Sequence, residues 1–244
     1  MTSSTFPPEL SPRSRGSSSP VCVIPVRGGS SRFPRKWSAE LAGKPLLWHT
    51  IACAASTRLF DPRNIYVNTD DKEIAWLALR GGAQVYMRPL ELGADTVQAG
   101  RVIAEQAETC RWHADTPVCV MLSTAPLTKP EDIVVSKALL SEKSPVVHAV
   151  TRLEHPIERA LRLDSRGQLS WAGGDPAVGD RGTQSFPLAF RITGGFTWVL
   201  AGHLTSTGSY WHEQMRGYEV ARETAVDIDG PEDLVLAEAL LRTR

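Results

Sequence analysis

The sequence predicts an α/β protein in which a mostly parallel sheet is flanked by helices. Short apolar runs alternate with segments of helical periodicity through most of the chain. The apolar runs are unbroken, as in strands that are buried on both faces of a parallel sheet. The chain has 244 residues, of which 42% are hydrophobic and 22% are charged, and this is enough for one large core.

The strands and helices can be placed in order along the chain. Each expected strand is an apolar run bounded by turn residues, and each expected helix has apolar residues at helical spacing. Pro45 suits a first helical position, and Gly81 with Gly82 ends the helix that starts at Asp71. The expected strands are 21–26, 64–68, 84–87, 118–122, 145–150, 196–200 and 223–229, and the expected helices are 45–57, 71–80, 97–108, 130–140 and 231–242.

Two segments stand outside this alternation. Residues 1–19 are rich in Ser and Pro with few apolar side chains, so we expect a disordered tail before the domain at 20–244. Residues 151–185 are polar and Gly-rich, and we expect a hairpin and loop that leave the main domain. Long irregular segments are usually functional or form interfaces, so this excursion is expected to mediate dimerisation.

Composition argues against several classes of function. The 27 Lys and Arg residues balance 27 Asp and Glu residues, so no general basic field favours nucleic acid or a membrane surface. No apolar run approaches the ~18 residues of a membrane span and no leader pattern is seen, so we expect a cytoplasmic protein. The four cysteines lack CxxC spacing and the six histidines lack HxH or HExxH pairing, which argues against zinc.

The loop 27–36 (RGGSSRFPRK) is the sharpest candidate for a site. It follows the first expected strand, and ligands of such sheets bind beyond the carboxyl ends of the strands. Gly28 and Gly29 let main-chain N–H groups approach an anion, and the Arg and Lys side chains could balance a polyphosphate. The loop lacks the GxxxxGK[ST] and GxGxxG patterns. It is either a phosphate-binding loop of another kind or a solvated basic turn.

An acidic pair, Asp227 and Asp229, lies at the end of the expected strand 223–229. Because side chains alternate along a strand, both carboxylates would face one side and could share a Mg²⁺ ion. The alternative is capping of the following helix, since acidic residues favour its first turn.

Two smaller polar groups follow other expected strands. Arg88-Pro89 with Asp95-Thr96 could offer a ligand a bidentate cation and polar caps, and a surface salt bridge explains them equally well. In Thr69-Asp70-Asp71, we expect Thr69 or Asp70 to be the N-cap of the following helix.

The order and spacing of these motifs resemble the acylneuraminate cytidylyltransferases from about Val21 to Leu240. Within that family, STAPL and AVTRLEHPIERAL are most similar to the pseudaminic acid cytidylyltransferases. The resemblance implies a Rossmann-like nucleotidyltransferase fold, CTP as donor, a small acidic nine-carbon keto-sugar as acceptor, Mg²⁺ and a homodimer formed through the excursion. The segments that carry it are VIPVRGGSSRFPRK, LAGKPLLWHTIACA, NTDDKEIA, GAQVYMRPLEL, ADT, STAPLTKPEDI and VDIDGPEDLVLAE.

Carried over position by position, the resemblance implies roles for individual residues. Arg27 and Lys36 would hold the triphosphate and take part in catalysis, and Arg88 would contact the base. Asp227 and Asp229 would complete the catalytic group by binding Mg²⁺. The remaining implied contacts are Gly28, Gly29, Ser30 and Asp95 for the nucleotide, and Thr124, Gln184, Arg191 and Thr193 for the sugar.

Some positions depart from the family pattern. Trp37 stands where the family has Asn, and Ala99 where a Ser or Thr hydroxyl meets the base. Arg159 or Arg181 could replace a cation that is missing on the sugar side. The other departures on that side are Thr183 or Gln184 for an Arg, Ile192 or Thr193 for an Asn or Asp, and Thr197 for a Tyr.

These departures leave two alternatives to an enzyme that makes a CMP-sugar. One is the same chemistry with another nucleotide or acceptor in a specialised metabolite pathway, where Trp37 could stack on a larger base. The other is a non-enzymatic nucleotide- or sugar-binding relative, which ranks last because the cations and both acids are present.

Overall fold

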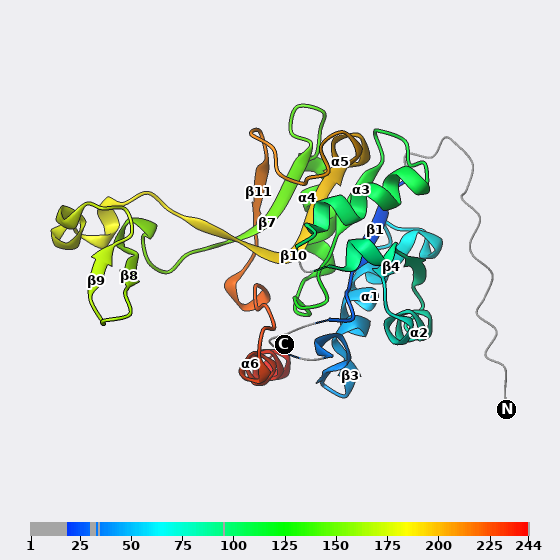
Figure 1. Cartoon of the computed structure of the whole chain (residues 1–244), viewed down its shortest axis with the longest axis horizontal. Helices are drawn as coiled ribbons and strands as arrows, with labels where there is room; N and C mark the ends of the chain where they lie inside the picture. Colours follow the sequence, from blue (N-terminus) through cyan, green and yellow to red (C-terminus); the bar gives the residue numbers. More distant parts are fainter. Residues whose placement is uncertain (1–18, 30–32, 34, 95, 244) are drawn as a thin grey trace.

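The computed structural model describes residues 19–29, 33, 35–94 and 96–243, and Figure 1 shows how they are arranged. The expected disordered tail lies outside the described residues except for Ser19. Ser30 and Asp95 also lie outside them. Within the part of the chain that is described, no helix has the length and apolar character needed to cross a bilayer.

A seven-stranded sheet forms the centre of the molecule. Its strands are β1 (Val21–Pro25), β4 (Ile65–Thr69), β5 (Gln84–Met87), β6 (Pro117–Val120), β7 (Val146–Arg152), β10 (Phe190–Leu200) and β11 (Arg216–Glu219). They lie in the order β11-β7-β10-β6-β1-β4-β5. All neighbours are parallel except β10, which runs antiparallel to β6 and β7. The mostly parallel sheet predicted from the sequence is therefore confirmed.

Helices cover both faces of this sheet (Figure 1). They are α1 (Leu46–Ser56), α2 (Lys72–Arg80), α3 (Ala99–Thr109), α4 (Pro130–Ser136), α5 (Ala201–Thr207) and α6 (Pro231–Arg242). Helices α1, α2 and α4 pack in one apolar cluster with Cys22 and Ile24, whereas α3 and α5 pack in another with Val21 and Val23. Since successive side chains of a strand face opposite ways, β1 has to be apolar at every position.

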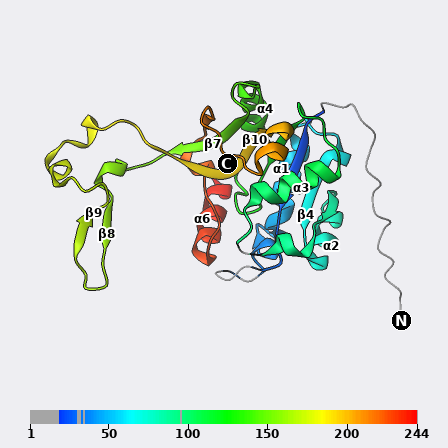
Figure 2. The ribbon, with the colours of Figure 1, turned by 45° about the horizontal axis from the view of Figure 1, so that its top comes forward.

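Residues 153–189, which we call the arm, extend away from this body in both Figure 1 and Figure 2. The arm holds the predicted hairpin, formed by β8 (Leu161–Leu163) and β9 (Leu169–Trp171), and the short 3₁₀ turns η5 (Ile157–Arg159), η6 (Pro176–Asp180) and η7 (Thr183–Ser185). The guanidinium of Arg159 donates to the main-chain oxygens of Val178, Gly179 and Arg181. These hydrogen bonds hold the irregular segment of the arm around residues 178–181 against Arg159.

The expected strand at 223–229 is wrong. Residues Arg222–Thr224 form a 3₁₀ turn, η8, and 225–229 have no regular secondary structure and do not join the sheet. The apolar residues there have other partners: Ile228 is fully buried with α6, and its N–H donates to the oxygen of Thr124 at 2.8 Å. The seventh strand is β11, whose sequence RGYE is too polar to be recognised as a strand.

Three helix boundaries also differ from expectation. Pro45 precedes α1 as its N-cap rather than being its first residue. The predicted helix 130–140 ends at Ser136 and continues as a 3₁₀ turn, η4 (Lys137–Leu139). The N-cap of α2 is neither Thr69 nor Asp70 but Asp71, whose side chain accepts from the N–H groups of Glu73 and Ile74.

Candidate active site

The loop after β1 and the segment before α6 meet at the carboxyl edge of the sheet. Lys36 lies in a 3₁₀ turn, η1 (Lys36–Ser38), and its Nζ donates to the main-chain oxygen of Ile228 at 2.7 Å and to Asp229 Oδ1 at 2.9 Å. An ammonium group has three donors, so one N–H of Lys36 remains after these two bonds. This contact places a phosphate-loop cation beside the acidic pair.

Asp227 is surrounded by residues that the sequence assigned to the same site. Desolvation of its carboxyl group and the charge of Asp229 raise the pKa of Asp227, and a hydrogen bond with Thr124 and the charges of Lys36 and Arg191 oppose this shift. The residue as a whole remains exposed. Five predicted site residues from four distant parts of the chain therefore lie together.

The acidic pair does not cap α6. The N–H groups of Asp229 and Gly230 both donate to Asp233 Oδ2 at 2.8 Å, so an acid of the helix itself closes this turn. The capping interpretation of Asp227 and Asp229 is therefore wrong.

The two carboxylates have the right chemistry for Mg²⁺. Proteins usually hold this ion through one or two carboxylates, and waters and substrate phosphates complete the octahedron. Among the described residues, no group of three or more His, Cys, Asp or Glu residues could hold a metal alone. Desolvation first, and then the like charge of Asp229, raise the pKa of Asp227, and a bound cation would favour the charged form of both carboxylates. The pair thus suits an ion that arrives with a polyphosphate.

The phosphate loop is divided in its contacts. Arg27 is exposed at its start, and a Cβ atom on Gly28 would lie 2.6 Å from Asp71 Oδ2, so this close approach requires glycine. At the other end, Arg35 pairs with Glu73 at 2.6 Å and does not point to the acidic pair. The described cations of the loop therefore do not all converge: Lys36 contacts the acidic pair, whereas Arg35 pairs with Glu73.

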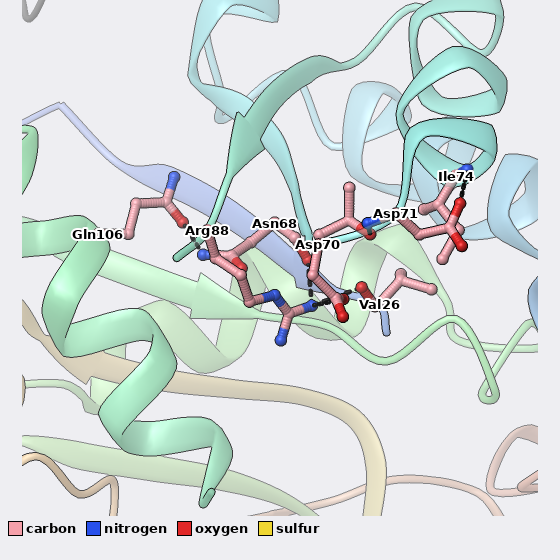
Figure 3. Close-up of polar contacts among 8 residues, drawn as sticks. Val26, Asn68, Asp70, Asp71, Ile74, Arg88 and Gln106 are labelled. Carbon is pink, nitrogen blue, oxygen red and sulfur yellow. Dashed lines mark hydrogen bonds and ion pairs between the residues drawn. The ribbon is translucent and has the colours of Figure 1, made fainter. Parts of the chain in front are cut away.

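Arg88 is buried rather than paired at the surface. Its side chain is 5% exposed, and its Nη2 donates to the main-chain oxygens of Val26 and Asn68 at the ends of neighbouring strands (Figure 3). Asp70 Oδ1 lies 3.8 Å from the same nitrogen. Asp95, which the sequence placed in the same polar group, lies outside the described residues. The surface salt-bridge interpretation of Arg88 is wrong.

Trp37 and Ala99, the two residues that depart from the family pattern at positions expected near the base, have different surroundings. Trp37 is 6% exposed and packs in the core with the guanidinium of Arg35 5.0 Å from its ring centre, so it does not present a free face to a ligand. Ala99 begins α3 and lines a cavity of about 260 Å³ together with Tyr210 and Trp211. The idea that Trp37 stacks on a base is therefore not supported by its position.

On the sugar side, the structure brings only part of the predicted set together. Arg191 lies near Asp227, with its Nη2 donating to the oxygen of Ala225 at 2.8 Å. Thr193 is buried, and its hydroxyl donates to the oxygen of Ala149 within the sheet. Gln184 lies in η7 of the arm, away from the body of its own chain (Figure 1).

The two replacement cations considered from the sequence also lie in the arm. Arg159 is engaged with the oxygens of the arm, as described above, and with the hydroxyl of Thr183. The guanidinium of Arg181 lies 4.3 Å from the ring centre of Phe186. Neither is placed at the acidic pair of its own chain.

Sequence reasoning missed Asp70 and the buried pair of Asn68 and Gln106, whose side-chain amides are hydrogen-bonded at 2.8 Å (Figure 3). One signal was available for Asp70, because two acids precede α2 and a single N-cap needs only one of them. No comparable signal marks Gln106, which lies on the buried face of α3.

The known proteins with similar sequences are described as cytidylyltransferases. Residues 21–163 match the cytidylyltransferase family. A pseudaminic acid cytidylyltransferase from Campylobacter jejuni is 28% identical over 91% of this chain and 96% of its own. A 3-deoxy-manno-octulosonate cytidylyltransferase from Anaeromyxobacter dehalogenans is 32% identical over 90% of this chain and 96% of its own.

Solved structures agree on the fold. A CMP:2-keto-3-deoxy-manno-octonic acid synthetase complexed with CTP superimposes with a TM-score of 0.66 at 19% identity, over 91% of this chain and 98% of its own. A 4-diphosphocytidyl-2C-methyl-D-erythritol synthase gives a TM-score of 0.68 at 14% identity, over 93% and 100%. The extent of the sequence match over residues 21–163 and the 32% identity to a full-length relative lead to one conclusion: this chain belongs to the cytidylyltransferase family.

Proposed function

We propose that this protein transfers the cytidylyl group of CTP to the anomeric hydroxyl of an acidic nonulosonic sugar similar to pseudaminic or sialic acid. The oxygen–phosphorus bond forms at the α-phosphorus, the bond between the α- and β-phosphates breaks, and pyrophosphate leaves. The observation that carries the proposal is the contact of Lys36 with Asp229, which joins a phosphate loop to an acidic pair at the ligand-binding edge of the sheet. Relatives that are named for this chemistry with pseudaminic acid and N-acylneuraminate support it.

Catalysis of this kind depends mainly on alignment and on neutralisation of charge. Arg27, Lys36 and the main-chain N–H groups at Gly28 would hold the triphosphate. Mg²⁺, held by Asp227 and Asp229 together with phosphate oxygens, would supply neutralisation of the triphosphate charge. The remaining donor of Lys36 can reach a phosphate oxygen while the other two keep the ammonium on Ile228 and Asp229.

The sugar would lie between the acidic pair and β10. Thr124 is hydrogen-bonded to Asp227, and Arg191 contributes a positive charge beside it. A guanidinium group suits the carboxylate of an acidic sugar because it can bind both oxygens at once. Arg191 is therefore proposed as the cation that selects an acidic acceptor.

The arm is proposed to join two copies of the chain into a homodimer. Leu161, Leu163 and Leu169 are exposed, and the register of the hairpin puts them on one face. An apolar face of this kind needs cover, and a second copy would provide it. Gln184 would then contribute to a sugar site only across the dimer. The cytoplasmic location expected from the sequence stays a prediction.

The second candidate is the same reaction with a different nucleotide. The position of Ala99 beside the cavity with Tyr210 and Trp211 favours it, because the side chain at position 99 itself offers no hydroxyl to the edge of a cytosine. All four nucleoside triphosphates, each combined with pseudaminic, sialic and legionaminic acids and assayed for pyrophosphate release, test both candidates. We expect release with CTP and at least one of these acids. Release with a purine nucleotide alone favours the second candidate, and no release with any pair contradicts both.

A further inference from the structure

Arg88 is a buried cation whose hydrogen bonds to the described residues are all made by one end of the guanidinium, Nη2. Its Nη2 donates to the oxygens of Val26 and Asn68, which lie at the ends of β1 and β4. In Figure 3 the other terminal nitrogen points away from Val26 and Asp70. The guanidinium thus has one fixed end and one end directed elsewhere.

Asp70 is the carboxylate that faces this cation. Its Oδ1 lies 3.8 Å from Arg88 Nη2, is buried, and has no hydrogen-bond partner among the described residues. Burial lowers the pKa of Arg88, the charge of Asp70 raises it, and the charge of Arg27 lowers it. A buried charge without a counter-charge is costly, so the proximity of these two groups stabilises both.

The position of the Asp70 carboxylate is confined on its other side by Gly93. A Cβ atom on Gly93 would lie 2.5 Å from Asp70 Oδ2, closer than real side chains approach. Gly93 ends the short turn η3 (Leu90–Gly93), which follows Arg88 in the chain. Asp70 is therefore held between Gly93 and Arg88.

Helix capping does not explain the acid at position 70. Asp71 Oδ1 accepts from the N–H groups of Glu73 at 2.7 Å and Ile74 at 3.1 Å, which completes the N-cap of α2. The neighbouring acid is thus available for a different role.

We propose that Asp70 is a positioning residue for Arg88 and, through it, sets the affinity and choice of the nucleobase. The inference rests on the proposed function and on the contact with the base that the family resemblance implies for Arg88. With Asp70 in place, Nη2 stays on its two carbonyl partners, and the rest of the guanidinium keeps one direction toward an acceptor on the base. Without the Asp70 carboxylate, Arg88 loses its counter-charge, and its guanidinium is no longer held in this orientation.

The substitution Asp70→Asn tests the inference because it keeps the shape of the side chain and removes its charge. We expect the KM for CTP to rise ~10-fold, with kcat and the KM for the sugar changed by less than about 3-fold. We also expect the preference for CTP over UTP to fall by a similar factor. A lower kcat with unchanged KM for CTP and unchanged preference overturns the inference.

Gly93→Ala provides a second test that leaves the charge of Asp70 intact. The added methyl group would push the carboxylate away from its place beside Arg88. We expect the same change in nucleotide preference as for Asp70→Asn, and a normal preference contradicts the proposal. The matched control is Asp61→Asn, because Asp61 also pairs with an arginine, Arg63, but precedes β4 instead of following it. This control should keep the wild-type KM values and preference.

NMR separates a failure of this inference from a failure of the proposed function. The Nε–H signal of Arg88, assigned by its loss in Arg88→Lys, is compared in the nucleotide-free protein and its variants. We expect Asp70→Asn to shift or broaden it and Asp61→Asn to leave it unchanged. An unchanged signal in Asp70→Asn overturns the inference even if the enzyme uses CTP. A shifted signal in a protein that releases pyrophosphate with no nucleotide supports the Asp70–Arg88 contact and contradicts the proposed function instead.

Discussion

In the body of the molecule, charged groups at the sheet edge are held by partners from distant parts of the chain. The arm is linked to the body by the ion pair of Glu154 with Arg222 at its base, but Arg159 farther out is held by contacts within the arm. Lys36 contacts Asp229, 193 residues away, and Arg88 contacts Val26, 62 residues away. In the arm, Arg159 reaches no further than Thr183, 24 residues away. The site therefore depends on the tertiary fold as a whole. The arm depends on its own short segments and leaves apolar side chains exposed for something else to cover.

The largest effect is expected at the acidic pair, where the distant contacts converge. We expect Asp227→Ala and Asp229→Ala each to abolish turnover while circular dichroism shows an intact fold. Each change removes a carboxylate that would hold Mg²⁺, and the charge neutralisation that such an ion supplies at the transferring phosphate is worth several kcal/mol. Full activity in both single variants would end the metal hypothesis.

A stability measurement gives this prediction a control. Since the pKa of Asp227 is raised in the folded state, its charge opposes folding above that pKa, and the penalty disappears as the pH falls through it. Asp227→Asn should therefore raise the melting temperature at pH 7 and have less effect at acid pH, although the variant is inactive. Asp233→Asn weakens the start of α6 and should lower the melting temperature instead. A lower melting temperature for Asp227→Asn at pH 7 would mean that desolvation does not control this carboxylate.

The next effect concerns the phosphate loop. Lys36→Ala and Arg27→Ala should each lower kcat/KM by ~10² or more, the scale of losing one preorganised donor to a developing negative charge. Because both side chains would contact phosphate, the loss should be similar for every nucleotide that the enzyme accepts. Steady-state kinetics with CTP and UTP measure this, and a loss confined to one base would place these residues at the base.

We expect substitutions in the arm to change dimerisation rather than folding. We expect the wild-type protein to be a dimer at micromolar concentration by light scattering. Leu163→Asp should shift it toward the monomer, because a charge would replace an exposed leucine on the apolar hairpin face. The melting temperature of the body should change little, since Leu163 pairs with Leu169 inside the hairpin of the arm. Arg162→Asp, on the opposite face of the hairpin, is the control, and a wild-type monomer would contradict the prediction.

The smallest effect is expected in the selection of the nucleobase. An unpaired polar group in a buried site costs ~1–3 kcal/mol, and Ala99 offers no hydroxyl to cytosine. We therefore expect CTP to be preferred over the other nucleotides by roughly tens-fold at most. Calorimetry with all four nucleotides and magnesium measures this margin. A preference beyond a thousandfold would show that the loss of the hydroxyl at Ala99 is compensated.

The parts of the fold that could be predicted are the segments whose own residues show the pattern of a strand or a helix. Residues 21–25 are apolar on both faces because they lie in the middle of the sheet, and 231–242 carry their own acidic N-terminus and helical spacing. The strand β11 was missed because it is a polar edge strand. Helix α5 was missed because it is short and rich in Ser and Thr.

The same distinction holds for the candidate site. The phosphate loop and the acidic pair are visible as motifs, but their contact depends on 225–229 crossing from the sheet to α6, which no local pattern encodes. The alternation of Val226, Ile228 and the two acids resembles a strand, although Ile228 packs against α6 instead of a sheet neighbour. Likewise, nothing next to Arg88 in the sequence indicates that its anchors would be main-chain oxygens of two other strands.

The hydrogen bond between Lys36 and Asp229 also determines when the site can form during synthesis of the chain. During synthesis the loop with Lys36 emerges well before Asp229, which lies 193 residues further along the chain, and Ile228 is buried only once α6 is present to cover it. A chain that stops before Asp227 would carry the loop with Lys36 but not the acidic pair. Such truncated copies would therefore be catalytically silent, so that activity reports chains that extend through the acidic pair.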